Sequence, residues 1–202
     1  MIIKIFTGPL NYSVNKVYKQ DDDEFIIGVD SGCMHLLKSN IIPDLGIGDF
    51  DSVSETEYKT IVSKIKNLKT YDRVKDYTDT YLAVKQALKF KYKEIIIYGG
   101  IGNRIDHTFA NINLLKLGNI SLVDETTEMY MLDPGIYTID NEFKYISFFA
   151  IEDVKGLTLK DFKYELEDID LDTFDPLCIS NEGSGTLEFK EGLMLVINQN
   201  EE

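Results

Sequence analysis

The first part of the chain alternates short apolar runs with segments of helical character. The apolar runs are rich in Ile and Val, which is typical of strands covered on both faces of a sheet. They lie at Ile2–Phe6, Phe25–Val29, Leu45–Ile47, Glu94–Tyr98 and Ile120–Val123. Alternation of strands and helices favours a mainly parallel sheet. We therefore predict an α/β domain over residues 1–125, with a Rossmann-like, mostly parallel sheet flanked by helices.

Three of the segments between these runs carry helix signals. Ser54 and Glu57 have the Ser-x-x-Glu spacing of a capping box, which predicts the start of a helix. Two further helices are predicted at Thr78–Phe90 and Arg104–Leu117. Gly118 is predicted to end the last of them, because glycine adopts the backbone conformation of a helix stop without strain.

After residue 125 the helical periodicity gives way to short strand-like pieces. These pieces are Met129–Leu132, Ile136–Ile139, Tyr145–Ala150, Leu157–Leu159, Thr186–Phe189 and Leu193–Ile197. Turn signals such as Asp133-Pro134-Gly135 separate them. We therefore predict a second domain over residues 126–202, an all-β sandwich or roll.

The composition indicates a folded, acidic protein. The 202 residues are 44% hydrophobic, and 21 Lys plus Arg stand against 35 Asp plus Glu, a formal net charge of -14. Binding to nucleic acid or to an anionic membrane normally needs a basic face, so we expect neither partner. Cys33 and Cys178 form no disulfide or zinc-site pattern, which favours reduced thiols in the cytoplasm. We also expect no signal peptide and no membrane helix.

Aspartates directly follow several of the predicted strands. Asp30 follows the second strand, Asp49 and Asp51 follow the third, and Asp76 and Asp79 follow a strand-like stretch over residues 69–74. The carboxyl ends of parallel strands share one edge of a sheet, and ligands bind there. Five carboxylates at one edge repel one another unless a cation or shifted pKa values relieve them. Mg²⁺ prefers carboxylate oxygens and shares its shell with phosphates, so the pattern indicates a magnesium site.

Each aspartate also has a structural alternative, because aspartates favour loops and cap helices. Asp76 is placed to cap the helix that follows it, and either Ser31 or Asp30 is placed to cap the helix through Leu37. The alternative is weaker for Asp49 and Asp51, since Ser54 already opens a capping box.

A glycine-rich segment follows the strand Glu94–Tyr98. Gly99, Gly100 and Gly102 leave room for phosphate to approach backbone N–H groups at a helix start. The segment is not a dinucleotide-binding fingerprint, because Ile105 stands where its last glycine would be. The chain also contains no Walker-type P-loop.

The predicted helix after this segment begins with polar side chains. Arg104, His107 and Asn111 are spaced i, i+3 and i+7, which predicts one shared helix face. Arg104 can bond a phosphate bidentately. In the alternative, Arg104 pairs with an aspartate and His107 caps or packs. Together with the aspartates, this arrangement indicates an enzyme that transfers a phosphate-type group from ATP with Mg²⁺ as cofactor, and it leaves the acceptor open.

The same motifs resemble the thiamine pyrophosphokinase family over nearly the whole chain. The segments that carry the resemblance are Gly48-Asp49-Phe50-Asp51-Ser52, Lys75-Asp76-x-Thr78-Asp79, Gly99-Gly100-x-Gly102-x-Arg104-x-Asp106-His107-x-x-x-Asn111 and Ser180-Asn181. The resemblance implies transfer of the pyrophosphoryl group of ATP to the hydroxyl of thiamine, giving thiamine diphosphate and AMP. It also implies a homodimer whose site lies at the subunit interface.

The resemblance implies roles for individual residues. The implied Mg²⁺ ligands are Asp30, Asp49, Asp51 and Asp79. Of these, Asp49, Asp51 and Asp79 are implied to be catalytic, with Asp51 or Asp79 helping to deprotonate the hydroxyl. The implied contacts to ATP and its phosphates are Asp30, Lys75, Asp76, Thr78, Gly100, Gly102, Arg104, Asp106, His107 and Asn111. Ser180 and Asn181 of the second domain are implied to contact thiamine.

The chain departs from the family pattern at several positions. Ser31 stands where the family often has Gly, and Tyr81 stands where Glu is expected. The chain contains no Trp, and the residues directly after Asn181 offer no aromatic side chain to stack on the pyrimidine of thiamine. The alternatives are a pyrophosphokinase or nucleotidyl enzyme with another acceptor such as a pterin alcohol, a non-catalytic nucleotide- or thiamine-binding regulator, and a structural acidic protein.

Overall fold

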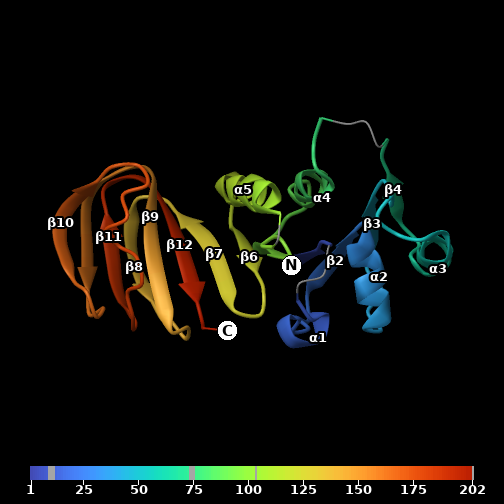
Figure 1. Ribbon diagram of the computed structural model, residues 1–202, viewed down its shortest axis with the longest axis horizontal. Coiled ribbons are helices and arrows are strands. Elements are labelled where there is room, and N and C mark those ends of the chain that lie inside the picture. The colour runs from blue at the N-terminus through green and yellow to red at the C-terminus, as the bar shows by residue number, and fades with distance from the viewer. Residues whose placement is uncertain (9–11, 73–75, 103, 202) are drawn as a thin grey trace. The chain divides into compact units, whose positions relative to one another are not determined.

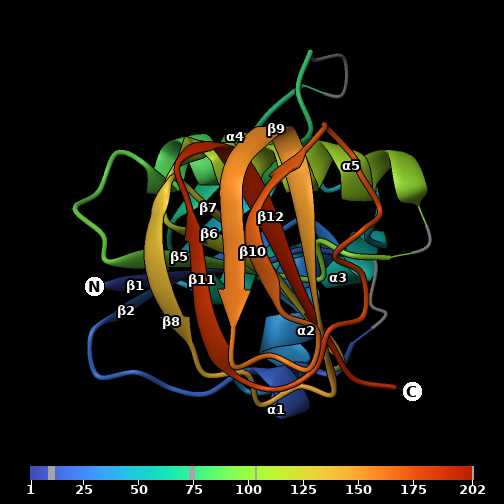
Figure 2. The ribbon, with the colours of Figure 1, turned by 90° about the vertical axis from the view of Figure 1, so that its left-hand side faces the viewer.

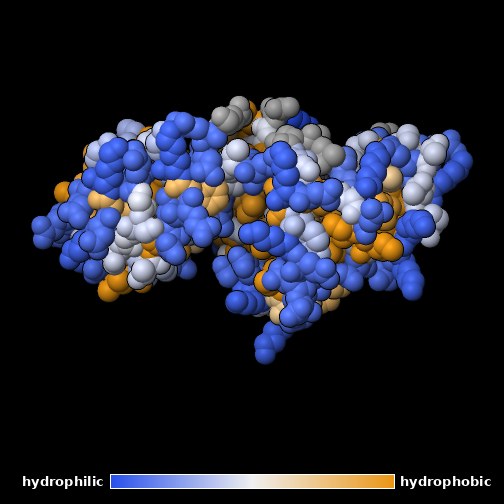
Figure 3. Space-filling view, turned by 90° about the horizontal axis from the view of Figure 1, so that it is seen from below, coloured by the Kyte–Doolittle hydropathy of each residue, from blue (hydrophilic) through white to orange (hydrophobic). Residues whose placement is uncertain are grey.

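The computed structural model describes residues 1–8, 12–72, 76–102 and 104–201 (Figure 1). The chain is mixed α/β, as the sequence predicts, and divides into two compact units, Met1–Glu125 (unit 1) and Thr126–Glu202 (unit 2). No helix in these described ranges is long and apolar enough to cross a membrane. The face seen in Figure 3 is predominantly hydrophilic, as expected from the net charge of -14.

The strands of unit 1 form a parallel sheet in the order β4-β3-β2-β1-β5-β6. Their bounds are β1 Ile2–Phe6, β2 Glu24–Val29, β3 Leu45–Gly48, β4 Leu68–Thr70, β5 Glu94–Tyr98 and β6 Ile120–Val123. The predicted bounds of β1, β5 and β6 are confirmed. The strand order reverses between β1 and β5, and open parallel sheets bind ligands outside the carboxyl ends at such a point.

Helices cover both faces of this sheet. They are α1 Val14–Val17, α2 Ser31–Lys38, α3 Glu55–Lys64, α4 Asp79–Ala87 and α5 Ile105–Leu114, followed by a 3₁₀ turn over Leu115–Leu117. Figure 1 shows α4 and α5 on one face and α1 and α2 on the other. The predicted capping box is confirmed, because Ser54 and Glu57 each accept a hydrogen bond from the other's backbone N–H. Gly118 ends the last turn, as predicted. The four-residue helix α1 was not predicted, since it is too short to show a period.

The strands of unit 2 pair antiparallel, in the order β7-β12-β9-β11-β8, with β10 paired to β9. Their bounds are β7 Thr127–Leu132, β8 Gly135–Ile139, β9 Tyr145–Lys160, β10 Leu166–Leu171, β11 Gly185–Phe189 and β12 Glu191–Gln199. Figure 2 shows β9 as a long, curved strand. Its first part pairs with β12 and its last part with β10 and β11.

Two strand predictions in unit 2 are wrong. The pieces predicted at 145–150 and 157–159 belong to the single strand β9, and the exposed Glu152, Asp153 and Lys155 interrupt its apolar pattern. The prediction also lacks β10, in which only Leu171 is fully buried. β10 is a strand because it pairs with β9. Most of its residues are exposed, so its sequence lacks the alternation of apolar and polar positions that would predict a strand.

A buried ion cluster stabilises the amino-terminal edge of the sheet in unit 1. Lys4 in β1 is 1% exposed, and its ammonium bonds Asp21 at 2.6 Å, Glu24 at 2.7 Å and the carbonyl of Lys19. The Tyr18 hydroxyl also donates to Glu24, at 2.5 Å. Burial would raise the pKa of Glu24, but the hydrogen bonds from Lys4 and Tyr18 outweigh it and lower the pKa below its ordinary value of 4.5.

We predict that Lys4→Met lowers the free energy of unfolding by about 3 kcal/mol at neutral pH, because it leaves buried carboxylate charge without its partner. Urea unfolding measures the effect. The double variant Lys4→Met with Glu24→Gln should recover much of the loss. Lys59→Met is the matched control, since its partner Glu55 and Lys59 itself are 83% and 73% exposed, and should have little effect.

The same cluster predicts a pH dependence. The folded state lowers the pKa of Glu24, so the stability that Glu24 contributes is complete above 4.5 and is lost as the pH falls through the folded-state pKa. The wild type should therefore lose more stability on acidification below pH 4.5 than a Glu24→Gln variant does. Equal losses in both proteins would contradict this role of Glu24.

Candidate active site

Three of the predicted metal ligands come together where β2 and β3 end and α4 begins. Asp30, Asp49 and Asp79 (the aspartate cluster) each offer one carboxylate oxygen, and these oxygens lie within 4.8 Å of one another. All three residues are half-buried, which limits their screening by water. Oxygen donors of this kind suit a hard cation such as Mg²⁺.

A close approach between two loops shapes the aspartate cluster. The backbone N–H of Phe50 donates to Oδ1 of Asp30 at 3.0 Å. A Cβ on Gly48 would lie 1.9 Å from the same oxygen, so only glycine fits there. Asp30 and Phe50 both have a positive φ, 48° and 56°, which is strained for residues other than glycine. The buried Phe50 side chain packs beside Ile61 and anchors the strained loop.

The helix-cap alternative does not account for Asp30 or Asp76. Asp30 stands at the N-cap position of α2, but its side chain makes no capping hydrogen bond. The N-cap of α4 is Thr78, whose hydroxyl accepts from the Tyr81 N–H at 3.2 Å. Asp76 is exposed and lies outside the aspartate cluster. Lys75 lies outside the described residues.

Asp51, the fourth predicted metal ligand, lies next to the aspartate cluster without belonging to it. Its backbone N–H donates to Oδ1 of Asp49 at 3.2 Å, and the residue is exposed. The buried Phe50 separates the two aspartates, so the Asp-Phe-Asp segment places Asp49 in the cluster and Asp51 at its exposed margin.

The glycine segment after β5 is held at the point where the strand order reverses. Gly99 has a φ of 80°, and a Cβ there would lie 2.3 Å from the ring of Tyr12. The Thr7 hydroxyl, directly after β1, donates to the Gly99 carbonyl at 3.1 Å. The buried side chain of Asn111 donates to the Gly100 carbonyl at 2.8 Å. Sequence reasoning missed Thr7, because a single threonine after a strand carries no motif.

The side chains of Arg104, His107 and Asn111 differ in their surroundings. His107 is exposed, whereas Asn111 is 5% exposed and bonds the glycine segment from within. Arg104 precedes the helix as its N-cap residue. The motif therefore combines a buried asparagine, Asn111, which bonds backbone, with two exposed side chains, Arg104 and His107.

Arg104 pairs with an aspartate, as the alternative interpretation held. Its guanidinium contacts Asp106 at 2.5 Å, and the two side chains are 64% and 65% exposed. The hydrogen bond from Arg104 lowers the pKa of Asp106 below its ordinary value. An exposed pair of this kind contributes little stability, so the guanidinium can exchange it for a phosphate. Gly102 belongs to the glycine segment whose backbone N–H groups were predicted to bind a phosphate. In the structure its N–H donates to Oγ1 of Thr108 at 3.2 Å.

Cys33 lies close to the aspartate cluster but is not suited to be a nucleophile. Burial, and then the negative charge of Asp30, raise the pKa of its thiol to about 12. The thiolate is the reactive form of cysteine, so Cys33 is inert at neutral pH. The carboxylates are therefore better candidates than Cys33 for the chemistry of this site.

The two predicted thiamine contacts in unit 2 differ in their surroundings. Ser180 is exposed, has a φ of 59°, and donates its N–H to Oγ of Ser147 at 3.0 Å. Asn181 is 2% exposed, and its side chain bonds the backbone of Tyr164 twice. Nδ2 donates to the Tyr164 carbonyl at 2.7 Å, and Oδ1 accepts from the Tyr164 N–H at 2.9 Å.

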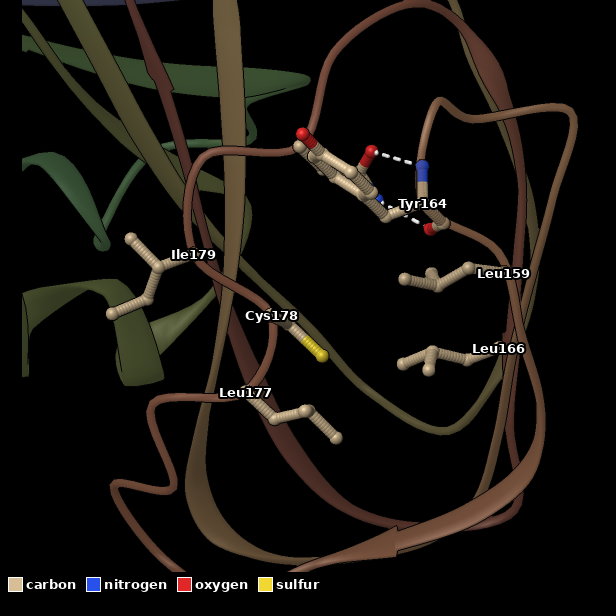
Figure 4. Close-up of a pocket in the computed structure, with 7 residues that line it drawn as sticks. Leu159, Tyr164, Leu166, Leu177, Cys178 and Ile179 are labelled. Carbon is tan, nitrogen blue, oxygen red and sulfur yellow. Dashed lines mark hydrogen bonds between the residues drawn. The ribbon is translucent and has the colours of Figure 1, made fainter.

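A cavity of about 250 Å³ opens beside Asn181 (Figure 4). Its lining residues are Leu159, Tyr164, Leu166, Leu177, Cys178, Ile179 and Asn181. Sequence reasoning missed it because one wall belongs to the unpredicted strand β10 and the turn before it. Tyr164 contributes an aromatic side chain to this lining.

Comparison with known proteins covers both units. A family model described as the catalytic domain of thiamin pyrophosphokinase matches residues 18–124, and one described as its vitamin B1 binding domain matches residues 136–194. Thiamine pyrophosphokinase of Bacillus subtilis (strain 168) is 38% identical over an alignment of 201 residues, and the match covers 94% of this chain and 94% of that protein.

Solved structures agree with the family models over the whole chain. The crystal structure of Bacillus subtilis thiamine pyrophosphokinase matches with a TM-score of 0.91 and 35% identity, covering 100% of both chains. A thiamin pyrophosphokinase family protein from Enterococcus faecalis matches with a TM-score of 0.90 and 29% identity, also over 100% of both chains. The chain therefore belongs to the thiamine pyrophosphokinase family and is an enzyme of this type.

Proposed function

We propose that this enzyme transfers the pyrophosphoryl group of ATP to the hydroxyl of thiamine in a Mg²⁺-dependent reaction, giving thiamine diphosphate and AMP. The observation that carries the proposal is the aspartate cluster, whose three residues fall within the match to the catalytic-domain model. The glycine segment and Arg104 fall within the same match. The match to the vitamin B1 binding model in unit 2 supports thiamine as the acceptor.

In this proposal Asp30, Asp49 and Asp79 hold Mg²⁺ at the carboxyl ends of the strands. The bound ion supplies charge neutralisation at the phosphates and at the transferred phosphorus. Arg104 turns from Asp106 to the phosphate oxygens, and its fork orients them bidentately. The remaining contacts to ATP stay predictions for Lys75, Asp76, Thr78, Gly100, Gly102, Asp106, His107 and Asn111.

The reaction joins the hydroxyl oxygen of thiamine to the β-phosphorus of ATP. The bond between the β-phosphorus and the oxygen bridging to the α-phosphorus breaks, and AMP leaves with that electron pair. The hydroxyl proton passes to a carboxylate. We assign this step to Asp51 before Asp79, because Asp51 is exposed beside the aspartate cluster whereas Asp79 belongs to it.

We further propose that unit 1 is a Rossmann-like ATP- and Mg²⁺-binding domain and unit 2 a β-sandwich that binds thiamine. The enzyme acts as a homodimer, in which Ser180 and Asn181 of the partner subunit complete each site. This arrangement rests on the family resemblance. A cytoplasmic location for thiamine diphosphate synthesis is favoured by the two buried, free thiols Cys33 and Cys178.

Purified protein incubated with ATP, Mg²⁺ and thiamine should form AMP and thiamine diphosphate in equal amounts. Liquid chromatography with mass detection measures both products. EDTA should abolish turnover, and excess Mg²⁺ should restore it. Formation of ADP with thiamine monophosphate, or of no thiamine product at all, would contradict the proposal.

Asp49→Asn should lower kcat/KM by at least about 100-fold, because it removes a charged ligand from a site that stabilises developing phosphate charge. Without metal, the same variant should melt no lower than the wild type, since it relieves repulsion within the aspartate cluster. Asp22→Asn is the matched control, an exposed aspartate of unit 1 for which we assign no role. If the two variants had the same activity, the aspartate cluster would have no part in the reaction.

A further inference from the structure

Two tyrosines stack on each other where α4 begins. The ring centroids of Tyr77 and Tyr81 lie 4.5 Å apart, and the angle between the ring planes is 15°. The two residues are four positions apart, and in the sequence they flank Asp79 of the aspartate cluster. Tyr81 stands where the family pattern leads us to expect Glu, and a glutamate could not form this stack. The pair is therefore a feature of this chain that the proposed function has not yet used.

Tyr77 keeps a large part of its surface in contact with solvent. The residue is 56% exposed although Tyr81 covers one face of its ring, so the opposite face is open to water. Phe6 and Tyr98 stack in a similar geometry, at 4.6 Å and 21°, but both are buried in the core. An exposed ring that is supported from one side can stack on a further aromatic ring with its free face.

The tyrosines lie on the flank of α4 that faces away from β4. Gln86 of α4 accepts a hydrogen bond from Lys69 of β4 at 2.7 Å, so its flank of the helix faces that strand. Asp79 precedes Gln86 by seven residues and shares this flank, whereas Tyr81 lies about 200° around the helix from Asp79. On its other side α4 packs against α5, the helix that follows the glycine segment (Figure 1). The pair therefore lies on the side of α4 nearer the glycine segment and the point where the strand order reverses.

Hydrogen bonds at the start of α4 hold the backbone that carries both rings. Thr78 lies between Tyr77 and the helix as the N-cap residue, and its hydroxyl accepts from the Tyr81 N–H at 3.2 Å. The carbonyl of Thr78 accepts from the N–H of Leu82 at 3.1 Å. A platform that is already ordered loses less conformational freedom when a ligand binds to it.

We propose that the free face of Tyr77 stacks on the adenine ring of ATP, and that Tyr81 holds Tyr77 in position. The inference rests on the proposed function, in which the aspartate cluster and Arg104 bind the phosphates of ATP. A nucleotide held by its phosphates needs a separate surface for its base. Adenine is flat, uncharged and aromatic, and bases stack on aromatic side chains through their π-faces.

The position of the pair favours the nucleotide over thiamine, whose rings are also aromatic. Tyr77 and Tyr81 fall within residues 18–124, the match to the catalytic-domain model, together with the aspartate cluster and Arg104. The vitamin B1 binding model matches residues 136–194 of unit 2 instead. A purely structural pair is the other alternative, since a side-chain contact across the N-cap can fix the entry of the chain into a helix.

The first test compares Tyr77→Leu with Tyr77→Phe. Removing the ring should raise the KM for ATP about tenfold, which corresponds to ~1.4 kcal/mol, and should leave kcat and the KM for thiamine unchanged. Phenylalanine keeps the ring and should keep the KM near that of the wild type. Phe174→Leu is the matched control, an aromatic residue of unit 2 that is 63% exposed. Equal KM values for ATP in Tyr77→Leu and Phe174→Leu, or a rise in the KM for thiamine instead, would overturn the proposal.

The second test examines the positioning role of Tyr81. Tyr81→Leu removes the supporting ring and should raise the KM for ATP, and adding Tyr77→Leu should raise it no further than Tyr77→Leu alone does. Residues that act through one another are not additive. Thermal melting of the same variants separates this role from a structural one. A lower melting temperature with an unchanged KM for ATP would show a purely structural pair and overturn the proposal.

The third test measures binding without turnover. The chain has no Trp, so Tyr77→Trp gives a single tryptophan at the proposed platform. ATP with Mg²⁺ should quench its fluorescence, whereas inorganic tripolyphosphate with Mg²⁺ should not, because it has no base. The tryptophan of Phe174→Trp should respond to neither. Equal quenching by ATP and tripolyphosphate would overturn the proposal.

The same variant separates this inference from the proposed function on which it rests. Quenching by ATP without formation of thiamine diphosphate would contradict the proposed transfer and support the stacking of the base. Formation of thiamine diphosphate without quenching by ATP would overturn this inference alone.

Discussion

The close approach of three carboxylates is the constraint that shapes the carboxyl edge of the sheet in unit 1. They offer oxygens within 4.8 Å of one another in half-buried positions. Two unit charges 4 Å apart interact by ~4 kcal/mol at an effective dielectric constant of 20, a large fraction of the stability of a typical domain. The loop that holds Asp49 accepts further strain at Phe50, and it needs a glycine at position 48. This arrangement is the basis of the proposed Mg²⁺–ATP chemistry.

A buried asparagine side chain fixes a backbone segment in each unit. Asn111 holds the carbonyl of Gly100 in unit 1, and Asn181 holds the backbone of Tyr164 in unit 2. Both asparagines belong to the motifs by which the chain resembles its family. Their buried side chains bond protein backbone, which satisfies the hydrogen bonds of buried groups and fixes the loops concerned.

The predictable parts of the fold and site are those whose signals are local. A capping box is complete within Ser54 and Glu57. A parallel sheet brings residues at neighbouring strand ends together, which is why the sequence could place Asp30 and Asp49 side by side, and Asp79 joins them from the start of α4. The roles of Asn111 and Asn181 depend on partners 11 and 17 residues away, and no local pattern records them. The exposed, acidic strand β10 escaped prediction for the same reason, because its pairing with β9 defines it.

The most direct test of the account is the position of the ion itself. Crystals grown with Mn²⁺ and a non-hydrolysable ATP analogue give an anomalous difference peak at the metal. The account predicts a peak coordinated by carboxylate oxygens of Asp30, Asp49 and Asp79 together with phosphate oxygens. A metal held by phosphate and water alone, with the three carboxylates turned away from it, would contradict the central claim.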